Sequence, residues 1–435
     1  MSIALRTQRG WLACAVALGL TACATFNTAD YVAPDVPLWL TRSTGAMTVT
    51  ARRVLTKEAR QIGDVREFGG TRRPPHERGS PEIDPASNRV FVGSSDGGFY
   101  ALRAEDLSSI WRFETERGAQ SEPVYDAELD VVYFGSQDGA LYCVRAATGD
   151  LVWRYNTGAE VSKRPARVGE TLYVANAADV LFAIDRRSGV TRWRVRRPSA
   201  LGREVQGYSA PTVDGDEVFL GFSDGHVMAY KRDMGADAWP EPADLLASAE
   251  LGGEEAKLLD VDTTPVVAHL PNLGRVVFVA AHASGVHALS GASGAPVWRQ
   301  EKALGVSDVV LWEEPAHRLP GAPSDDPILP ARSLLLASSS LSGLWALEPS
   351  TGEIVWRIRI PDGGISAPVP AMGALLVGSP RHGLHLISPL NGRGIDGIDT
   401  GTGFTGHPAV YGKRAYALSN NGVLLALSID PPLPR

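Results

Sequence analysis

Val132-Tyr-Phe-Gly-Ser-Gln-Asp-Gly-Ala-Leu-Tyr-Cys-Val144 is the stretch of sequence that decides the fold, because it recurs along the chain. A second copy starts at Val90 and reads Val-Phe-Val-Gly-Ser-Ser-Asp-Gly-Gly-Phe-Tyr-Ala-Leu. The turn residue of this motif occurs eight times, 39 to 60 residues apart, at Gly97, Gly139, Asp179, Gly225, Gly285, Gly343, Gly383 and Gly422. Eight copies with a period of roughly 40 residues predict a β-propeller with four strands in each blade.

Each repeat can be interpreted strand by strand. A Pro opens most units, such as Pro123 and Pro165, and the first residue of a strand tolerates Pro because no ladder donor is lost there. Asp-Gly or a similar pair then supplies the positive φ angles of a tight hairpin. A second hairpin at Thr-Gly or Ser-Gly leads to a strand that carries a Trp, at Trp111, Trp153, Trp193, Trp298 and Trp356. We expect each indole to pack between neighbouring blades and to bury up to about 250 Å².

Ring closure requires one more strand, because the eighth unit ends at Ser428-Ile-Asp-Pro-Pro without a Trp strand. Residues 36–40, Val-Pro-Leu-Trp-Leu, are the predicted closing strand, which would remove two exposed sheet edges. The predicted fold is therefore all-β: an eight-bladed propeller of four-stranded antiparallel blades over residues 36–435, closed by an N-terminal strand. The 46 Gly and 30 Pro residues agree with so many turns.

Three segments break the repeat. Unit four has Met234-Gly-Ala-Asp-Ala-Trp-Pro-Glu-Pro where the Thr-Gly hairpin and its Trp strand are expected. Unit six carries an insertion over 313–330 that is rich in Pro and Asp, and residues 51–80 are rich in Arg. These segments are interpreted either as solvated loops or as contacts to a partner.

The amino terminus predicts a lipoprotein. Arg6 and Arg9 precede a short apolar stretch, which is too short to span a bilayer and ends at Leu20-Thr-Ala-Cys23. This pattern resembles a bacterial lipobox, in which Cys23 is acylated and the chain is cut before it; the alternative is an ordinary secretory signal. Removal of residues 1–22 would leave 413 of the 435 residues, and the net charge would change from −7 to −9. Residues 23–35 would form a tether, with the lipid at the periplasmic face of an outer membrane.

The cysteines then predict a domain without disulfides. Cys14 leaves with the signal, Cys23 carries lipid, and Cys143 remains alone. Cys143 occupies the slot that small Ala residues fill in other units, such as Ala101 and Ala183. We expect a buried structural thiol there rather than a reactive one.

Composition and missing motifs exclude several classes of function. A net charge of −7 argues against a general nucleic-acid binder, and three Cys residues exclude a multi-Cys zinc module. The chain contains no Gly-x-Ser-x-Gly, no His-Glu-x-x-His and no phosphate-binding glycine loop. Two His pairs, His282 with His287 and His382 with His385, are interpreted as solvated turn residues. Neither an enzyme activity nor a bound cofactor or metal is expected.

The repeat resembles that of the PQQ-like β-propellers, and within them the BamB-like lipoproteins of the outer-membrane β-barrel assembly machinery. The strings that carry the resemblance are Leu259-Asp260-Val-Asp262-Thr-Thr-Pro-Val-Val267 and Pro198-Ser199…Arg203…Ser209-Ala-Pro-Thr212. The resemblance covers residues 36–430. It implies that the loops with these strings contact the periplasmic POTRA region of BamA, the barrel-inserting subunit. The residues implied to bind that partner are Leu201, Arg203, Asp260 and Asp262, although the leucine pattern around Arg203 is incomplete and its spacing to Ser209 is three residues longer.

The implied function is that of a scaffold that aids outer-membrane protein assembly and presents its surface to unfolded outer-membrane proteins. Two alternatives remain open: a PQQ-like propeller lipoprotein of another envelope complex, and a quinoprotein dehydrogenase. The second conflicts with the absence of adjacent cysteines. From the residues alone, Asp260 and Asp262 form a small negative spot on an extended segment. That spot can meet a basic partner, cap nearby backbone donors or bind calcium weakly.

Overall fold

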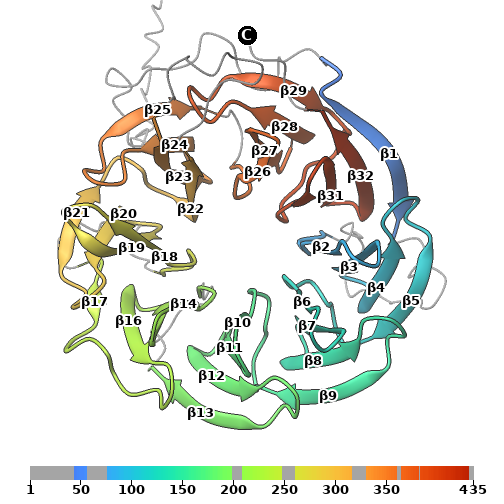
Figure 1. Cartoon of the computed structure of the whole chain (residues 1–435), viewed down its shortest axis with the longest axis horizontal. Coiled ribbons are helices and arrows are strands. Elements are labelled where there is room, and N and C mark those ends of the chain that lie inside the picture. The colour runs from blue at the N-terminus through green and yellow to red at the C-terminus, as the bar shows by residue number, and fades with distance from the viewer. Residues whose placement is uncertain are drawn as a thin grey trace, which may run out of the picture. The chain divides into compact units, whose positions relative to one another are not determined.

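The computed structural model describes residues 44–55, 76–197, 208–246, 260–315, 330–359, 364–381 and 383–430, which belong to one compact unit. These residues form eight four-stranded antiparallel sheets that follow one another around a ring (Figure 1). The predicted all-β, eight-bladed propeller is therefore confirmed. All eight predicted turn residues have positive φ, including the one non-glycine, Asp179, at 55°.

Each blade runs from an inner strand near the ring axis to an outer strand at the rim. Blades 1 to 4 consist of β2 (Glu82–Asp84), β3 (Arg89–Gly93), β4 (Gly98–Arg103) and β5 (Ser109–Glu114); β6 (Val124–Asp126), β7 (Val131–Gly135), β8 (Ala140–Arg145) and β9 (Leu151–Asn156); β10 (Ala166–Val168), β11 (Thr171–Asn176), β12 (Val180–Asp185) and β13 (Thr191–Arg196); and β14 (Thr212–Asp214), β15 (Glu217–Gly221), β16 (His226–Lys231) and β17 (Ala243–Asp244). Blades 5 to 8 consist of β18 (Val266–Leu270), β19 (Gly274–Ala281), β20 (Gly285–Ser290) and β21 (Pro296–Gln300); β22 (Val306–Glu314), β23 (Arg332–Ser339), β24 (Gly343–Leu347) and β25 (Ile354–Ile358); β26 (Val369–Ala371), β27 (Ala374–Ser379), β28 (Gly383–Ile387) and β29 (Gly394–Ile398); and β30 (Ala409–Tyr411), β31 (Arg414–Leu418), β32 (Val423–Ile429) and β1 (Met47–Val54).

The hydrophobic core lies between the faces of neighbouring blades. Phe99 of blade 1 and Phe134 of blade 2, for example, are fully buried and stack with ring centroids 3.7 Å apart. Buried clusters of the same kind join blades 2 and 3, 6 and 7, 7 and 8, and 8 and 1, and one larger cluster spans blades 3 to 5. Because each blade buries apolar area against the next, the middle strands can be apolar on both faces.

The repeated tryptophans dock on the following blade, as predicted. In the described residues six indole Nε1 groups donate to a backbone oxygen of the next blade at 2.9–3.2 Å: Trp111 to Ala146, Trp153 to Arg186, Trp193 to Arg232, Trp239 to Gly291, Trp298 to Pro349 and Trp356 to Pro389. A turn glycine lies under each ring. At Gly149, with φ +79°, an added Cβ would be 2.8 Å from Cδ2 of Trp111. The glycine thus gives the indole room to lie flat on the next blade.

Unit four departs from the repeat less than its sequence indicated. Trp239 is fully buried and makes the same contact as the other five indoles, with Gly235 placed under Trp193. The regular outer strand of this blade shrinks to the two residues of β17, because Pro240 and Pro242 follow the Trp. Blade 4 therefore keeps its docking tryptophan, although the hairpin that leads to it differs in sequence from those of the other blades.

Cys143 is buried as predicted. Its side chain is 1% exposed and lies opposite Trp153 in the pairing of β8 with β9. Burial, with a contribution from Asp126, raises the pKa of the thiol to about 12. A thiol with so high a pKa is almost entirely protonated at neutral pH and is unreactive.

The ring is closed by an N-terminal strand, but not by the one that the sequence suggested. Residues 36–40 lie outside the described residues, and β1 (Met47–Val54) takes the outer position of blade 8, where it pairs with β32. Ala51 faces Ala426, the place that a Trp takes in other blades. The correction has a physical cause: the closing segment must also reach Asp396 of blade 7, whose buried carboxylate accepts the backbone N–H groups of Thr44 at 2.9 Å and of Met47 at 2.7 Å.

Candidate functional site

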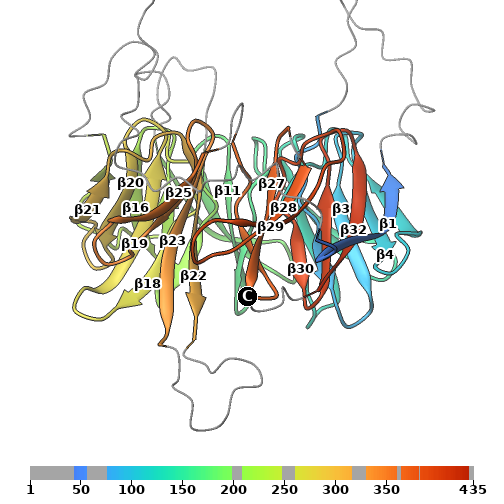
Figure 2. The ribbon, with the colours of Figure 1, turned by 90° about the horizontal axis from the view of Figure 1, so that it is seen from above.

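Two of the predicted partner-binding residues, Asp260 and Asp262, lie in the connection that leads into β18. Leu201, Arg203 and the predicted lipidation site Cys23 lie outside the described residues. The two connections with the resemblance strings each join an outer strand to the inner strand of the next blade, β13 to β14 and β17 to β18. Their described ends therefore lie at the same face of the ring, opposite the long hairpin of β22 and β23 (Figure 2). We call it the connection face.

The backbone of residues 260–265 is held firmly by alternating buried side chains. Val261 is fully buried over Gly221, and its N–H donates to the oxygen of Phe222 at 3.0 Å. The hydroxyl of Thr263 donates to Ala280 O at 2.9 Å and accepts from Ala280 N at 2.8 Å. Asp260 and Asp262 alternate with these residues and are half-buried. The predicted pair of carboxyl groups on one side of an extended segment is thus present.

Lys163, which stands just before the first strand of blade 3, also contacts this segment, which leads into blade 5. Its Nζ donates to the backbone oxygen of Asp262 at 3.1 Å. Burial raises the pKa of Asp262 to about 7; Lys163 opposes this shift, while Asp260 and Asp308 add to it. Among the described residues, the buried Oδ1 of Asp262 has no hydrogen-bond partner, so this oxygen does not cap a backbone donor.

Around the ring axis, charged groups from three further blades meet. His407 Nε2 lies 3.3 Å from Asp308 Oδ1, and its Nδ1 lies 3.9 Å from Glu122. Burial works against a charged imidazole, but the attraction of Asp308 and Glu122 prevails and raises the pKa of His407 to about 9. Burial likewise opposes ionisation of Asp308, yet His407 and Lys163 lower its pKa to about 2. Blades 2, 6 and 8 are thereby linked by ion pairs.

These axial residues were missed by the sequence analysis, although the repeat contained a signal. Glu122, Arg164 and His407 each stand directly before the Pro that opens an inner strand, and Lys163 stands one residue earlier. Equivalent positions of a closed ring meet around its axis, so charged residues at this position belong together.

The prediction of solvated turn histidines is wrong for His287 and His385, which are 5% and 4% exposed. They lie at the same strand position, next to the blade interior. Burial, and to a smaller extent the positive charge of Arg299, lowers the pKa of His287 to about 4. The Nε2 atom of His287 forms a hydrogen bond of 2.8 Å with the hydroxyl of Ser284. The ring of His287 is therefore a neutral packing group.

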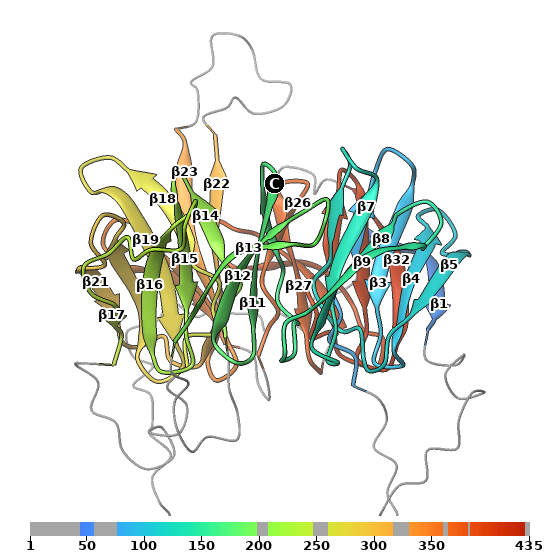
Figure 3. The same cartoon turned by 90° about the horizontal axis from the view of Figure 1, so that it is seen from below.

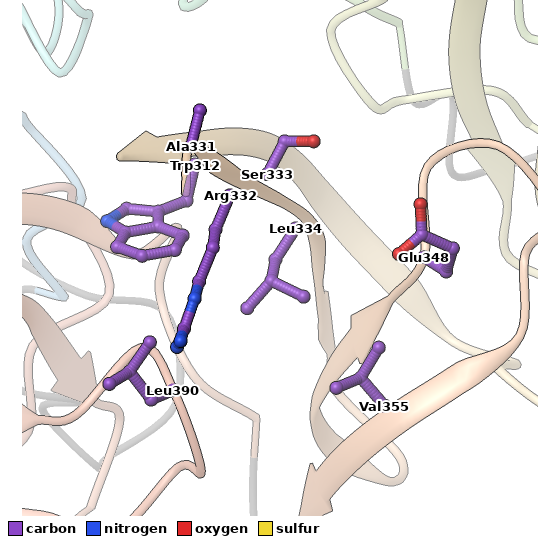
Figure 4. Close-up of a pocket in the computed structure, with 8 residues that line it drawn as sticks. All are labelled: Trp312, Ala331, Arg332, Ser333, Leu334, Glu348, Val355 and Leu390. Carbon is purple, nitrogen blue, oxygen red and sulfur yellow. The ribbon is translucent and has the colours of Figure 1, made fainter. Parts of the chain in front are cut away.

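A separate cavity of about 370 Å³ is lined by residues of blade 6 and by Leu390 of blade 7 (Figure 4). Its apolar walls are Trp312, Leu334, Val355 and Leu390, and its two charged side chains are those of Arg332 and Glu348. It lies away from the connection face, beside the hairpin of β22 and β23, and it lacks the converging polar groups of a catalytic pocket.

Within the part of the chain that the structure describes, no group of three or more His, Cys, Asp or Glu side chains is arranged to hold a metal ion. No helix of those residues has the length and apolarity needed to cross a bilayer. The described part of the connection face carries half-buried, ionisable side chains on a backbone that buried neighbours hold in place.

Comparison with known proteins agrees with the propeller and the repeat. The family model described as "Outer membrane protein assembly factor BamB" matches residues 108–358. The chain is 28% identical over 223 residues to the BamB of Legionella pneumophila (51% of each chain) and 35% identical over 219 residues to that of Vibrio cholerae (50% of this chain and 54% of the relative). The matched regions thus span about half the length of these curated relatives.

Solved structures share the fold. BamB from Moraxella catarrhalis superposes with a TM-score of 0.64 at 20% identity, over 88% of this chain and 99% of that one. A quinohemoprotein alcohol dehydrogenase from Pseudomonas putida superposes with a TM-score of 0.61 at 14% identity, over 92% of this chain and 80% of the enzyme. At such identities the likeness shows the propeller fold alone.

Proposed function

Because the chain belongs to the family of the outer membrane protein assembly factor BamB, we propose that it is a lipoprotein scaffold of the β-barrel assembly machinery. In this role it binds the POTRA region of the BamA-like, barrel-inserting subunit and aids the assembly of outer-membrane proteins. The single observation that carries the binding site is the segment 260–265. Its two carboxylates stand on a backbone that Val261, Thr263 and Lys163 hold in place.

The physical reason is preorganisation. A segment that is already ordered loses little conformational entropy on binding, so more of the contact energy contributes to affinity. Because burial raises the pKa of Asp262, the positive charge of a partner's Arg or Lys near this half-buried residue favours its ionised form. Leu201 and Arg203 belong to the proposed contact through the neighbouring connection, as the family resemblance implies.

The anchor in this proposal is Cys23. Acyl chains on that residue hold the protein at the periplasmic face of the outer membrane, and residues 24–35 serve as a tether. Two or more acyl chains are needed for firm anchoring, since a single chain binds only marginally.

We further propose that the protein acts by binding, without an enzymatic step. The dehydrogenase that shares the fold is a distant neighbour, and this chain has no adjacent cysteines. Unfolded outer-membrane proteins are the second class of partner, bound at free strand edges by β-augmentation.

Charge reversal tests the site. The double variant Arg203→Glu with Asp260→Lys should reduce co-purification of the barrel-inserting subunit while the melting temperature stays unchanged. A matched control is Asp216→Lys with Arg232→Glu, which reverses the same charges on the opposite face of blade 4, where the pair is 3.5 Å apart and exposed. Equal recovery of the subunit with both variants would refute the assigned site. Recovery of a different envelope complex with the wild-type protein would refute the assigned machinery.

A further inference from the structure

The repeat provides an internal comparison of the outer strands. The residue directly after the docking Trp is an Arg in five blades: Arg112, Arg154, Arg194, Arg299 and Arg357. In three of these blades the guanidinium covers an aromatic ring of the adjacent strand, Arg112 over Tyr100 and Arg154 over Tyr142 at 5.5 Å, and Arg357 over Trp345 at 4.4 Å. In blade 5, Arg299 donates to Ser284 O at 3.0 Å. The usual role of this Arg is therefore a contact within its own blade.

Blade 3 differs. The residue opposite Arg194 is Phe182, which is buried and packs edge-to-face on Tyr155 of blade 2, with centroids 5.6 Å apart. Arg194 is exposed and, among the described residues, has no ion pair, hydrogen bond or ring contact. Phe182 lacks a hydroxyl group like that of Tyr100, which accepts a hydrogen bond from Nε of Arg112 at 3.1 Å, and the guanidinium of Arg194 is left in solvent.

Two more exposed arginines flank Arg194 in β13: Arg192, at the β-bulge of this strand, and Arg196, on the same side as Arg194. The residue before the docking Trp is aliphatic in blades 1, 2, 5 and 6, namely Ile110, Val152, Val297 and Val355, but it is Arg192 in blade 3. Arg196 is exposed and has no ion pair in the described part of the chain, whereas Arg192 pairs with Asp185 at 2.7 Å. A chain with a net charge of −7 thus carries three exposed arginines on one outer strand, and two of them, Arg194 and Arg196, occupy regular alternate positions.

The strand that bears them has a free edge. β13 is the last strand of its sheet, on the rim of the ring (Figure 1), and its backbone faces solvent along that edge (Figure 3). Alternate residues of a strand are about 6.6 Å apart, which is also the spacing of alternate carboxylates in an extended segment. β13 also ends directly before residues 198–207, which carry Leu201 and Arg203.

We propose that β13 is a docking edge for an extended, acidic segment of a partner protein. The segment adds a fifth strand to blade 3, with backbone hydrogen bonds along the free edge. Two alternate Asp or Glu side chains of the segment pair with Arg194 and Arg196. The proposal does not depend on the identity of the partner, so it stands or falls separately from the proposed function.

Two other roles of the three arginines predict different results in the binding experiment described below. Charges on an edge strand also prevent edge-to-edge aggregation, and basic surfaces attract anionic lipid. A lipid surface binds the arginines through their charge alone, whatever the geometry of the strand. A peptide that adds a strand to β13 also needs free backbone N–H and C=O groups of its own.

The test uses the mature protein and a labelled peptide of alternating Thr and Glu, with binding followed by fluorescence polarisation. The variant Arg194→Glu with Arg196→Glu should bind roughly tenfold more weakly, because two attractions become repulsions. The matched control is Arg103→Glu with Arg145→Glu, two exposed residues at the ends of β4 and β8, which should bind as wild type. N-methylation of the peptide backbone at alternate residues should also weaken binding.

Three outcomes would overturn the proposal: no binding of the acidic peptide by the wild-type protein, equal losses for both double variants, or binding that N-methylation leaves unchanged. Sedimentation with phosphatidylcholine vesicles with and without phosphatidylglycerol tests the lipid role. A selective loss of vesicle binding in the Arg194/Arg196 variant, with peptide binding intact, would assign the arginines to the membrane instead.

Discussion

The closure of the ring by β1 yields a quantitative prediction at Asp396. This carboxylate is fully buried at the position where other blades carry the docking Trp, and it accepts the N–H groups of Thr44, Met47 and Gly397 at 2.9, 2.7 and 2.8 Å. Asp396→Ala leaves the N–H of Met47 buried and unpaired, whereas the N–H of the exposed Thr44 can turn to water. An unpaired buried donor costs about 1–3 kcal/mol and a lost hydrogen bond to a charged group about 1.5–3 kcal/mol. The substitution also removes a buried charge, which offsets part of this cost. We therefore expect the closing strand to lose roughly 2–4 kcal/mol of stability.

The loss should concentrate in β1, because the remaining pairs of β1 with β32 still hold the ring. Amide hydrogen exchange of residues 47–54, measured by mass spectrometry, reports this local opening. A change of 2–4 kcal/mol corresponds to roughly 30- to 700-fold faster exchange. Asp396→Asn should give a smaller effect, since one acceptor oxygen is retained.

Asp399→Ala is the matched control. Asp399 lies three residues further on, is exposed, and accepts one backbone N–H, that of Gly401, at 2.8 Å. Its substitution should leave the exchange of β1 unchanged. If the amides of residues 47–54 exchange at the same rate in the Asp396→Ala variant and in the wild type, the conclusion that Asp396 holds the closing strand in place is refuted.

Two further predictions concern the ring interior. The pKa of His407 is raised to about 9 from its ordinary 6.5, so its stabilising effect is fully present below about pH 6.5 and is lost as the pH rises through 9. In urea titrations the stability difference between wild type and His407→Asn should shrink between about pH 7 and pH 10; a constant difference would contradict the ion pair. Trp239→Ala should cost about 3–5 kcal/mol, because a fully buried indole is removed from the interface of blades 4 and 5. Met234→Ala, at a 64% exposed side chain of the same connection, should change the melting temperature little, and similar melting of both variants would contradict the docking role.

Much of the fold followed from the sequence because a propeller repeats its local rules. The period, the eight turn positions and the Trp slots are all local patterns, and each is found in the structure at the predicted residues. The deviation in unit four was overestimated because the sequence showed the broken hairpin but not the path that returns Trp239 to its slot.

The candidate site was predicted only in part. Asp260 and Asp262 were identified from the family resemblance and from their alternation with Val261. Lys163 was missed because it meets Asp262 across 99 residues of sequence, and no local pattern links the two. Arg194 likewise resembles its counterparts in the sequence, and only the structure shows that it has no ring, ion-pair or hydrogen-bond partner among the described residues.

The sequence by itself determined the kind of protein: an all-β ring of eight blades, with a lipobox-like terminus and the motifs of one family. Tertiary structure alone decided which N-terminal segment closes the ring, which charges meet at the axis and which arginine is left without a ring to cover. The physical reason is that blade formation depends on contacts between residues about 40 positions apart or fewer, which the repeat encodes. Closure joins residues that are far apart in the sequence, such as Thr44 and Asp396 at 352 positions, and their meeting, like that of the axial ion pairs, depends on the completed ring.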